Sequence, residues 1–226
     1  MRMRRKRNLD ERLAACGDVV IHPELTDKNM KTSVLRKEYL DLAALFGNDR
    51  PVRVEIGSGK GFFACSLAKL HPEYNVLAVE MISNVAIVGA ERAKAEGIAN
   101  VKFLISRAEC LEKYLREGCA EAIYLNFSTP LPKDGYAKQR LTHERFLRIY
   151  ERLLTPDGVI CQKTDNVPFF EFSMEQFRRC GFTLSGITYD LKEGDIPENI
   201  VTEHEKMFSE RGIPICRLEA RKGEKV

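Results

Sequence analysis

Two patterns of apolar and polar residues alternate along this chain. Short apolar runs rich in Val, Ile, Leu and Phe are typical of strands that are buried on both faces. Longer stretches with apolar residues three and four positions apart are typical of amphipathic helices. The short runs predict strands over residues 52–57, 74–81, 101–106, 120–127, 159–165, 183–191 and 214–222. The longer stretches predict helices over residues 34–47, 61–72, 84–97, 108–118, 169–182 and 203–211, and a helix followed by a turn over residues 141–158.

This alternation predicts an α/β fold. Strands and helices in turn give a parallel sheet with helices on both faces, which is a three-layer α/β/α sandwich of about seven strands. Only a short helix joins the last two strands, so we expect the final strand to run antiparallel. One domain over residues 31–226 accounts for the whole pattern. Residues 1–30 lack periodicity and are expected to form an irregular basic arm.

Composition narrows the class of protein. No apolar run approaches the roughly 18 residues that a membrane helix needs. The basic start, MRMRRKRNLDERL, lacks the apolar segment of a signal peptide, so we expect a cytoplasmic protein. The seven cysteines are scattered without a C-x-x-C pair. We therefore expect reduced, mostly buried thiols, and neither a metal site nor a disulfide framework.

The basic residues are clustered, although the net charge is only +3. One cluster lies in residues 2–7 and a second lies in residues 133–148. Clusters of this kind are typical of surfaces that bind nucleic acid. The alternative is a disordered start together with a solvated helix face.

A glycine loop follows the first predicted strand of the core. Gly57, Gly59 and Gly61 have the spacing G-x-G-x-G and precede a helix. The spacing matches neither a P-loop nor the dinucleotide fingerprint. Glu80 ends the next strand, 19 positions after Gly61, where a carboxylate can accept both hydroxyls of a ribose. This predicts a nucleoside cofactor without a pyrophosphate, such as S-adenosylmethionine; the alternative is that the glycines only turn the chain and Glu80 caps the next helix.

A loop with two prolines follows the predicted strand 120–127. It reads NFSTPLPK, and its prolines prevent further ladder pairing. The ends of strands in α/β proteins are where ligands bind, so basic residues there predict contact with phosphate or RNA. These residues are Lys133, Lys138 and Arg140. For Lys133 the alternative is a solvated loop lysine.

Taken together, several motifs resemble the bacterial tRNA (guanine-N7)-methyltransferase family. They are MRMRRK, VEIGSGKG, NFSTPLPK with the basic run after it, KTDN and NIVTEHEKMFSERGIPICRLEARK. The resemblance implies a class I, Rossmann-like methyltransferase fold. It also implies methyl transfer from S-adenosylmethionine to N7 of the guanosine at position 46 in the variable loop of tRNA. It leaves the oligomeric state open between monomer and homodimer.

The resemblance also implies roles for particular residues. Those that correspond to cofactor-binding positions are Glu55, Gly57, Gly59, Gly61, Glu80, Arg107 and Asn126. Those that correspond to tRNA-binding positions are Lys133, Lys138, Arg140, Asp165, Thr202 and Glu205. Arg107 departs from the family, which usually has Asp, Asn or Gln there to contact the adenine. From spacing alone, Asp165 also fits an N-cap and Thr202 with Glu205 also fits a capping box.

The largest departure lies in the proline loop. The family loop reads N-F-P-D-P-W-P-K, so Thr129 stands where the family has an acid at the reacting centre. Guanine N7 carries no proton, and its methylation creates a cation that a carboxylate would stabilise. We therefore expect reduced activity or a substitute acid, for which Asp165 is the candidate catalytic residue. The alternatives are a divergent paralogue that binds tRNA or cofactor with little transfer, and a methyltransferase for another substrate. The four histidines, including His143 inside the helix after the loop, are expected to be surface residues.

Overall fold

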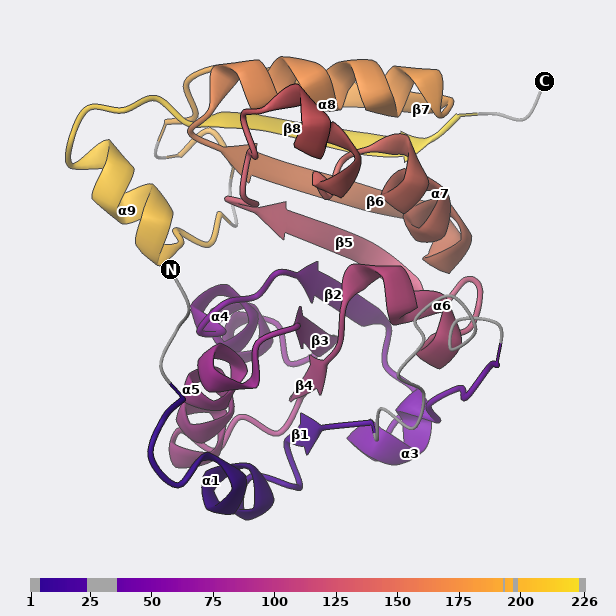
Figure 1. The fold of residues 1–226 in the computed structure, drawn as a ribbon, viewed down its shortest axis with the longest axis vertical. Coiled ribbons are helices and arrows are strands. Elements are labelled where there is room, and N and C mark those ends of the chain that lie inside the picture. Colours follow the sequence, from indigo (N-terminus) through magenta and orange to yellow (C-terminus); the bar gives the residue numbers. More distant parts are fainter. Residues whose placement is uncertain (1–4, 24–35, 193, 197–198, 224–226) are drawn as a thin grey trace. The chain divides into compact units, whose positions relative to one another are not determined.

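A computed structural model describes residues 5–23, 36–192, 194–196 and 199–223. The chain divides into two compact units, Met1–Tyr114 and Leu115–Val226, which we call unit 1 and unit 2. Each unit contains four strands (Figure 1). The eight strands among the described residues exceed the expected seven by one short strand near the start of the chain.

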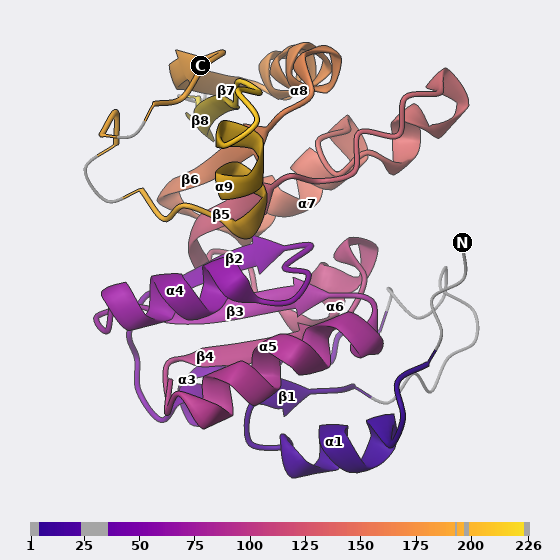
Figure 2. The ribbon, with the colours of Figure 1, turned by 90° about the vertical axis from the view of Figure 1, so that its left-hand side faces the viewer.

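Unit 1 is a parallel sheet with helices on both faces. Its strands lie in the order β1-β4-β3-β2, and each neighbouring pair is parallel. The strands are β1 (Val20–Ile21), β2 (Val52–Ile56), β3 (Asn75–Glu80) and β4 (Val101–Ile105). The helices are α1 (Leu9–Ala15), α3 (Leu42–Phe46), α4 (Phe62–Leu70), α5 (Ser83–Ala95), the 3-10 helix η1 (Ala108–Cys110) and α6 (Leu111–Tyr114). Helices α4 and α5 cover one face of these strands and α6 lies on the other (Figure 2).

Unit 2 has a mixed sheet in the order β5-β6-β8-β7. Strands β5 and β6 are parallel, whereas β8 is antiparallel to both β6 and β7, so the expectation of an antiparallel final strand is confirmed. The strands are β5 (Ala120–Asn126), β6 (Leu154–Thr164), β7 (Phe182–Thr188) and β8 (Cys216–Lys222). The helices are the 3-10 helix η2 (Asp134–Gln139), α7 (Glu144–Leu153), α8 (Val167–Arg179) and α9 (Glu203–Ser209).

The expectation that residues 1–30 are irregular was wrong for α1 and β1. Helix α1 is held on α5 by Arg12, whose Nε and Nη2 each lie 2.6 Å from the Glu91 carboxylate. Strand β1 has only two residues and pairs with β4. An element that short has no periodicity to detect. Residues 1–4 and 24–30 lie outside the described part of the chain.

Three other predicted elements had wrong bounds. The helix expected over residues 34–47 is only α3, because two backbone hydrogen bonds to the segment Lys113–Tyr114 hold residues 38–40 in a non-helical path. Residues 34 and 35 lie outside the part of the chain that the structure describes. The helix expected over residues 108–118 begins as η1 and ends at Tyr114. Strand β6 begins at Leu154, so it includes the turn expected at the end of the segment 141–158.

All seven cysteines are free thiols, and five of them are buried. The described side chains include no cluster of His, Cys, Asp and Glu that could hold a metal ion. No described helix is both long enough and apolar enough to cross a membrane.

Candidate functional site

In unit 1 the glycine loop joins β2 to α4 in a backbone conformation that favours glycine. Gly57, Gly59 and Gly61 have φ angles of 77°, 57° and 69°. These values lie in the left-handed region, which L-residues with a side chain adopt at a cost. The N–H groups of Gly57 and Ser58 both donate to the Val79 carbonyl, at 2.9 and 3.0 Å. The loop is therefore tied to the carboxyl end of β3.

Glu80 connects the glycine loop to the segment after β3. One carboxylate oxygen accepts a hydrogen bond from the Gly59 N–H at 3.1 Å, and the other accepts from the Ile82 N–H at 3.0 Å. A carboxylate has about four acceptor positions, so both oxygens retain acceptor capacity for the hydroxyls of a ribose. The predicted contact is thus compatible with this geometry.

The surroundings of the loop fit a nucleoside cofactor. Glu55 on β2 is buried, with 3% of its surface exposed. The Ser58 hydroxyl is buried and has no hydrogen-bond partner among the described residues. A Cβ built on Gly59 meets nothing within 4 Å, so the backbone there borders open space. Arg107 lies just before η1 with half of its side chain exposed, and its guanidinium pairs with Glu109 at 3.3 Å.

Gly61 and Gly59 predict a contrast in stability. A Cβ at Gly61 would lie 2.5 Å from the buried Phe103 ring, so Gly61→Ala combines overpacking with an unfavourable φ. We expect it to lower the free energy of unfolding by about 2–5 kcal/mol. Gly59→Ala, at a similar φ but with open space, should lose only about 1–2 kcal/mol. Urea unfolding of the two variants measures this contrast, and equal losses would contradict the packing argument.

In unit 2 the proline loop begins at Asn126, the last residue of β5. Phe127 and Leu131 have φ angles of 50° and 46°, which are unusual for residues with large side chains. Hydrogen bonds at both positions hold this backbone. The Phe127 N–H donates to the Lys163 carbonyl at 2.8 Å, and the Arg140 guanidinium donates to the Leu131 carbonyl at 3.1 Å through Nη2.

The basic residues of the loop divide into two groups. Arg140 is buried, and its guanidinium lies 4.4 Å from the centroid of the Phe172 ring. Its observed role is to support the loop. Lys133 and Lys138 lie at the two ends of η2, and both are exposed, so a polyanion can reach them. The side chain of Thr129 is also exposed to solvent.

Asp165 directly follows β6 and is half-buried. Because β5 and β6 are parallel with Asn126 opposite Lys163, Asp165 emerges beside the proline loop. Its carboxylate makes no hydrogen bond to a described residue. The alternative that Asp165 caps α8 was wrong, because Asn166 is the N-cap and accepts from the Phe169 N–H at 2.9 Å. Burial, followed by the Asp165 charge, raises the pKa of Cys216 to about 11.

Thr202 and Glu205 form a capping box at the start of α9. The Thr202 hydroxyl accepts from the Glu205 N–H at 3.0 Å, and both residues are 5% exposed. The sequence did not reveal that Lys163 also pairs with Glu205 at 2.7 Å, both side chains being buried. Asn199 contacts both members of this pair. These contacts occupy the Glu205 carboxylate, which the resemblance assigned to tRNA. The sequence feature that could have indicated the ion pair is Lys163, a charged residue within an otherwise buried strand.

His143 differs from its predicted position. It precedes α7 as the N-cap, and its Nδ1 accepts from the Arg145 N–H at 3.2 Å. Burial lowers the pKa of His143. Its role in unit 2 is therefore structural.

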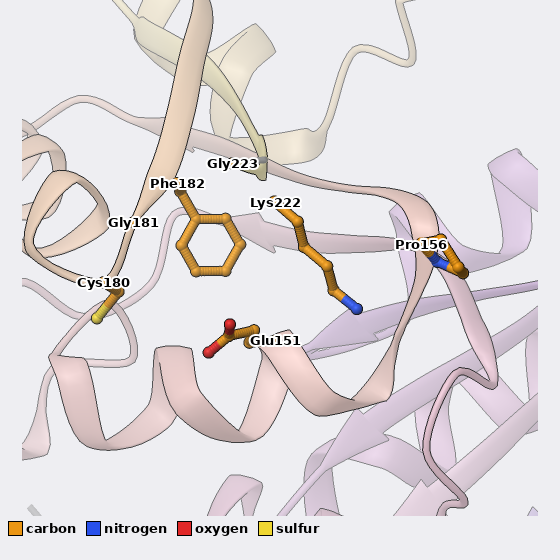
Figure 3. Close-up of a pocket in the computed structure, with 7 residues that line it drawn as sticks. All are labelled: Glu151, Pro156, Cys180, Gly181, Phe182, Lys222 and Gly223. Carbon is orange, nitrogen blue, oxygen red and sulfur yellow. The ribbon is translucent and has the colours of Figure 1, made fainter. Parts of the chain in front are cut away.

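A separate cavity of about 440 Å³ lies at the amino ends of β6 and β7 (Figure 3). None of the predicted site residues lines it. Its lining residues are Glu151, Pro156, Cys180, Gly181, Phe182, Lys222 and Gly223. Ligands of α/β sheets bind at the carboxyl ends of the strands, so this cavity is not the candidate site.

Comparison with known proteins places these features in a family. A family model described as "Putative methyltransferase" matches residues 49–218. The tRNA (guanine-N(7)-)-methyltransferase of Geobacillus kaustophilus is 39% identical over 97% of this chain and 96% of its own length. The protein of the same name from Listeria monocytogenes serotype 4b is 44% identical over 78% of this chain and 83% of its own.

Solved structures support the fold. The 16S rRNA methyltransferase KamB has a TM-score of 0.61 and 17% identity, covering 81% of this chain and 93% of its own. A SAM-dependent methyltransferase from Aquifex aeolicus has a TM-score of 0.54 and 13% identity, covering 95% and 98%. The predicted methyltransferase fold class is confirmed. The chain belongs to the tRNA (guanine-N7)-methyltransferase family.

Proposed function

We propose that this protein transfers a methyl group from S-adenosylmethionine to N7 of a guanosine in tRNA, the guanosine lying in the variable loop. The observation that carries the proposal is the 39% identity to an enzyme of that name over 97% of the chain. The glycine loop and the carboxylate of Glu80 supply features that a nucleoside cofactor needs. Cofactor contacts made by the tightly turned backbone of the glycine loop do not depend on the side chain of Arg107, which departs from the family.

The residues of unit 1 are assigned to the cofactor. The left-handed glycines bring backbone close to a ligand, and Glu80 presents acceptors for ribose hydroxyls. Glu55 and the unpartnered Ser58 hydroxyl add buried polar groups next to the loop. When bound, S-adenosylmethionine supplies an electrophilic methyl group on sulfur.

The residues of unit 2 are assigned to the tRNA. Exposed Lys133 and Lys138 bind phosphates, which position the RNA, and the loop held by Arg140 presents them. Guanine N7 is methylated without a general base, so the protein has to align the base and stabilise the positive charge that develops on it. Asp165 is the carboxylate beside the loop that is suited to this task. Asn126, at the end of β5, lies at the same edge.

Thr129 favours a second candidate function, a paralogue that binds tRNA or cofactor with little transfer. The two functions are separated by incubating the protein with labelled S-adenosylmethionine and an unmodified tRNA transcript, followed by mass spectrometry of the nucleosides. We expect 7-methylguanosine from a tRNA with guanosine in its variable loop. The matched transcript with adenosine at that position should yield none. No product, with cofactor binding intact, would favour the paralogue.

A further inference from the structure

Three aromatic rings lie together in unit 2, at the start of the proline loop and on α9. The Phe127 ring is stacked with the His204 ring at a centroid distance of 5.6 Å and an interplanar angle of 21°. Phe208, one turn after His204, lies 5.8 Å from Phe127 and 6.2 Å from His204. His204 is exposed, whereas the two phenylalanines are half-buried. The cluster therefore presents the histidine ring to solvent.

The unusual backbone conformation of Phe127 indicates that its ring has a functional role. A φ of 50° is unfavourable for a bulky residue, and glycine or asparagine would adopt it at lower cost. Such outliers concentrate at functional sites. What phenylalanine adds here is a ring that contacts α9, in a turn fixed by the hydrogen bond to the Lys163 carbonyl.

Packing of the core does not explain the orientation of α9. This helix buries the polar residues Thr202 and Glu205 and leaves the His204 ring exposed. The buried pair of Lys163 with Glu205 fixes the helix at the end of β6. His204 thus has a defined position near the end of β6, which Asp165 directly follows.

We propose that the exposed face of His204, backed by Phe127 and Phe208, is a stacking platform for one nucleobase of the tRNA. The proposal rests on the proposed function. Proteins that read RNA loops stack splayed bases on aromatic side chains, including histidine. Exposed Lys133 and Lys206 place positive charge on the same loop and helix, as a polyanion requires.

The test measures tRNA binding separately from transfer. Fluorescence anisotropy with a labelled, unmodified tRNA transcript and S-adenosylhomocysteine gives the Kd for His204→Ala, His204→Leu and His204→Phe. Loss of one stacked base corresponds to a weakening of about 5- to 150-fold. We expect this loss in the alanine and leucine variants, and recovery of most of the affinity in the phenylalanine variant. The exposed Ser209 on the same helix supplies the control, and Ser209→Ala should bind as the wild type does.

A second variant separates the platform from a structural role. Phe127→Gly relieves the unfavourable φ but removes the ring, so we expect weaker tRNA binding with little change in melting temperature. Equal tRNA affinity in wild type and His204→Ala would overturn the proposal, as would full affinity in His204→Leu. Because binding is measured without transfer, a protein that makes no 7-methylguanosine but loses tRNA affinity in these variants refutes the proposed activity and keeps the platform.

Discussion

Asp165→Asn is expected to lower kcat for methyl transfer about 100- to 1000-fold, the usual effect of removing one electrostatic group aimed at a developing charge. Asparagine keeps the shape and a hydrogen-bond acceptor but removes the negative charge. The product guanine is a cation, so the charge matters more in the transition state than in the bound substrate. KM for S-adenosylmethionine should stay within about twofold, because an interaction made only in the transition state leaves ground-state binding unchanged.

The neighbouring Asn166 provides the matched control. It caps α8, whereas the Asp165 carboxylate has no hydrogen bond to a described residue. We expect Asn166→Ala to lose about 0.5–2 kcal/mol of stability while keeping most of its kcat. Asp165→Asn should show the reverse pattern, with an unchanged melting temperature. Steady-state kinetics and thermal unfolding of both variants decide the matter, and an Asp165→Asn enzyme with wild-type kcat would remove Asp165 from the mechanism.

Thr129 tests whether the charge rather than the residue is required. If Asp165 substitutes for the acid that the family loop carries, Thr129→Asp should restore much of the rate lost in Asp165→Asn. In the wild-type background the same substitution should change kcat by less than about tenfold, because one carboxylate already serves. The double-mutant cycle therefore reports coupling between two positions that share a role.

The fold of this protein could be predicted from the sequence where elements are long and regular. Strand β2, the glycine loop and α4 follow one another with the expected spacing, because glycines at positive φ leave a local signature. The two-residue strand β1 and the helix α1 left no such signature. The position of β1 depends on its pairing with β4. The position of α1 depends on the ion pair between Arg12 and Glu91, which lie 79 residues apart in the chain.

The residues proposed for the site were chosen from the sequence, but the contacts of several of them could not be predicted from it. Arg140 was expected on the tRNA, and its position in the sequence did not reveal that it supports Leu131 from within the protein. The left-handed turn at Phe127 was equally hidden, because phenylalanine rarely adopts it. In both cases tertiary contacts decide a conformation or partner that local sequence leaves open.

Glu205→Ala should have the largest effect on stability. Its carboxylate lies 2.7 Å from the Lys163 ammonium, and the two side chains are 7% and 8% exposed. Removing one partner of a buried ion pair leaves the other charge uncompensated, which costs about 3–5 kcal/mol. Chemical unfolding at neutral pH measures this loss. The double variant Lys163→Met with Glu205→Leu should recover most of it, because apolar residues of similar size replace buried pairs at little cost.

Loss of the capping box alone has to be separated from loss of the ion pair, and Thr202→Ala does so. It removes the side-chain cap but leaves Lys163 paired, so we expect a loss of only about 0.5–2 kcal/mol. A Glu205→Ala variant that is no less stable than Thr202→Ala would contradict the argument from charge burial.

The pH dependence of the Glu205→Ala variant gives the last test. Burial lowers the pKa of Lys163 below its ordinary value of 10.5, and Glu205 counteracts this shift. Without Glu205 the folded protein binds fewer protons than the unfolded chain over a wider range below pH 10.5, so stability rises with pH over that range. The deficit of Glu205→Ala relative to wild type should therefore shrink as the pH rises from about 7 to about 10. The deficit of Thr202→Ala, which involves no titrating group, should stay constant.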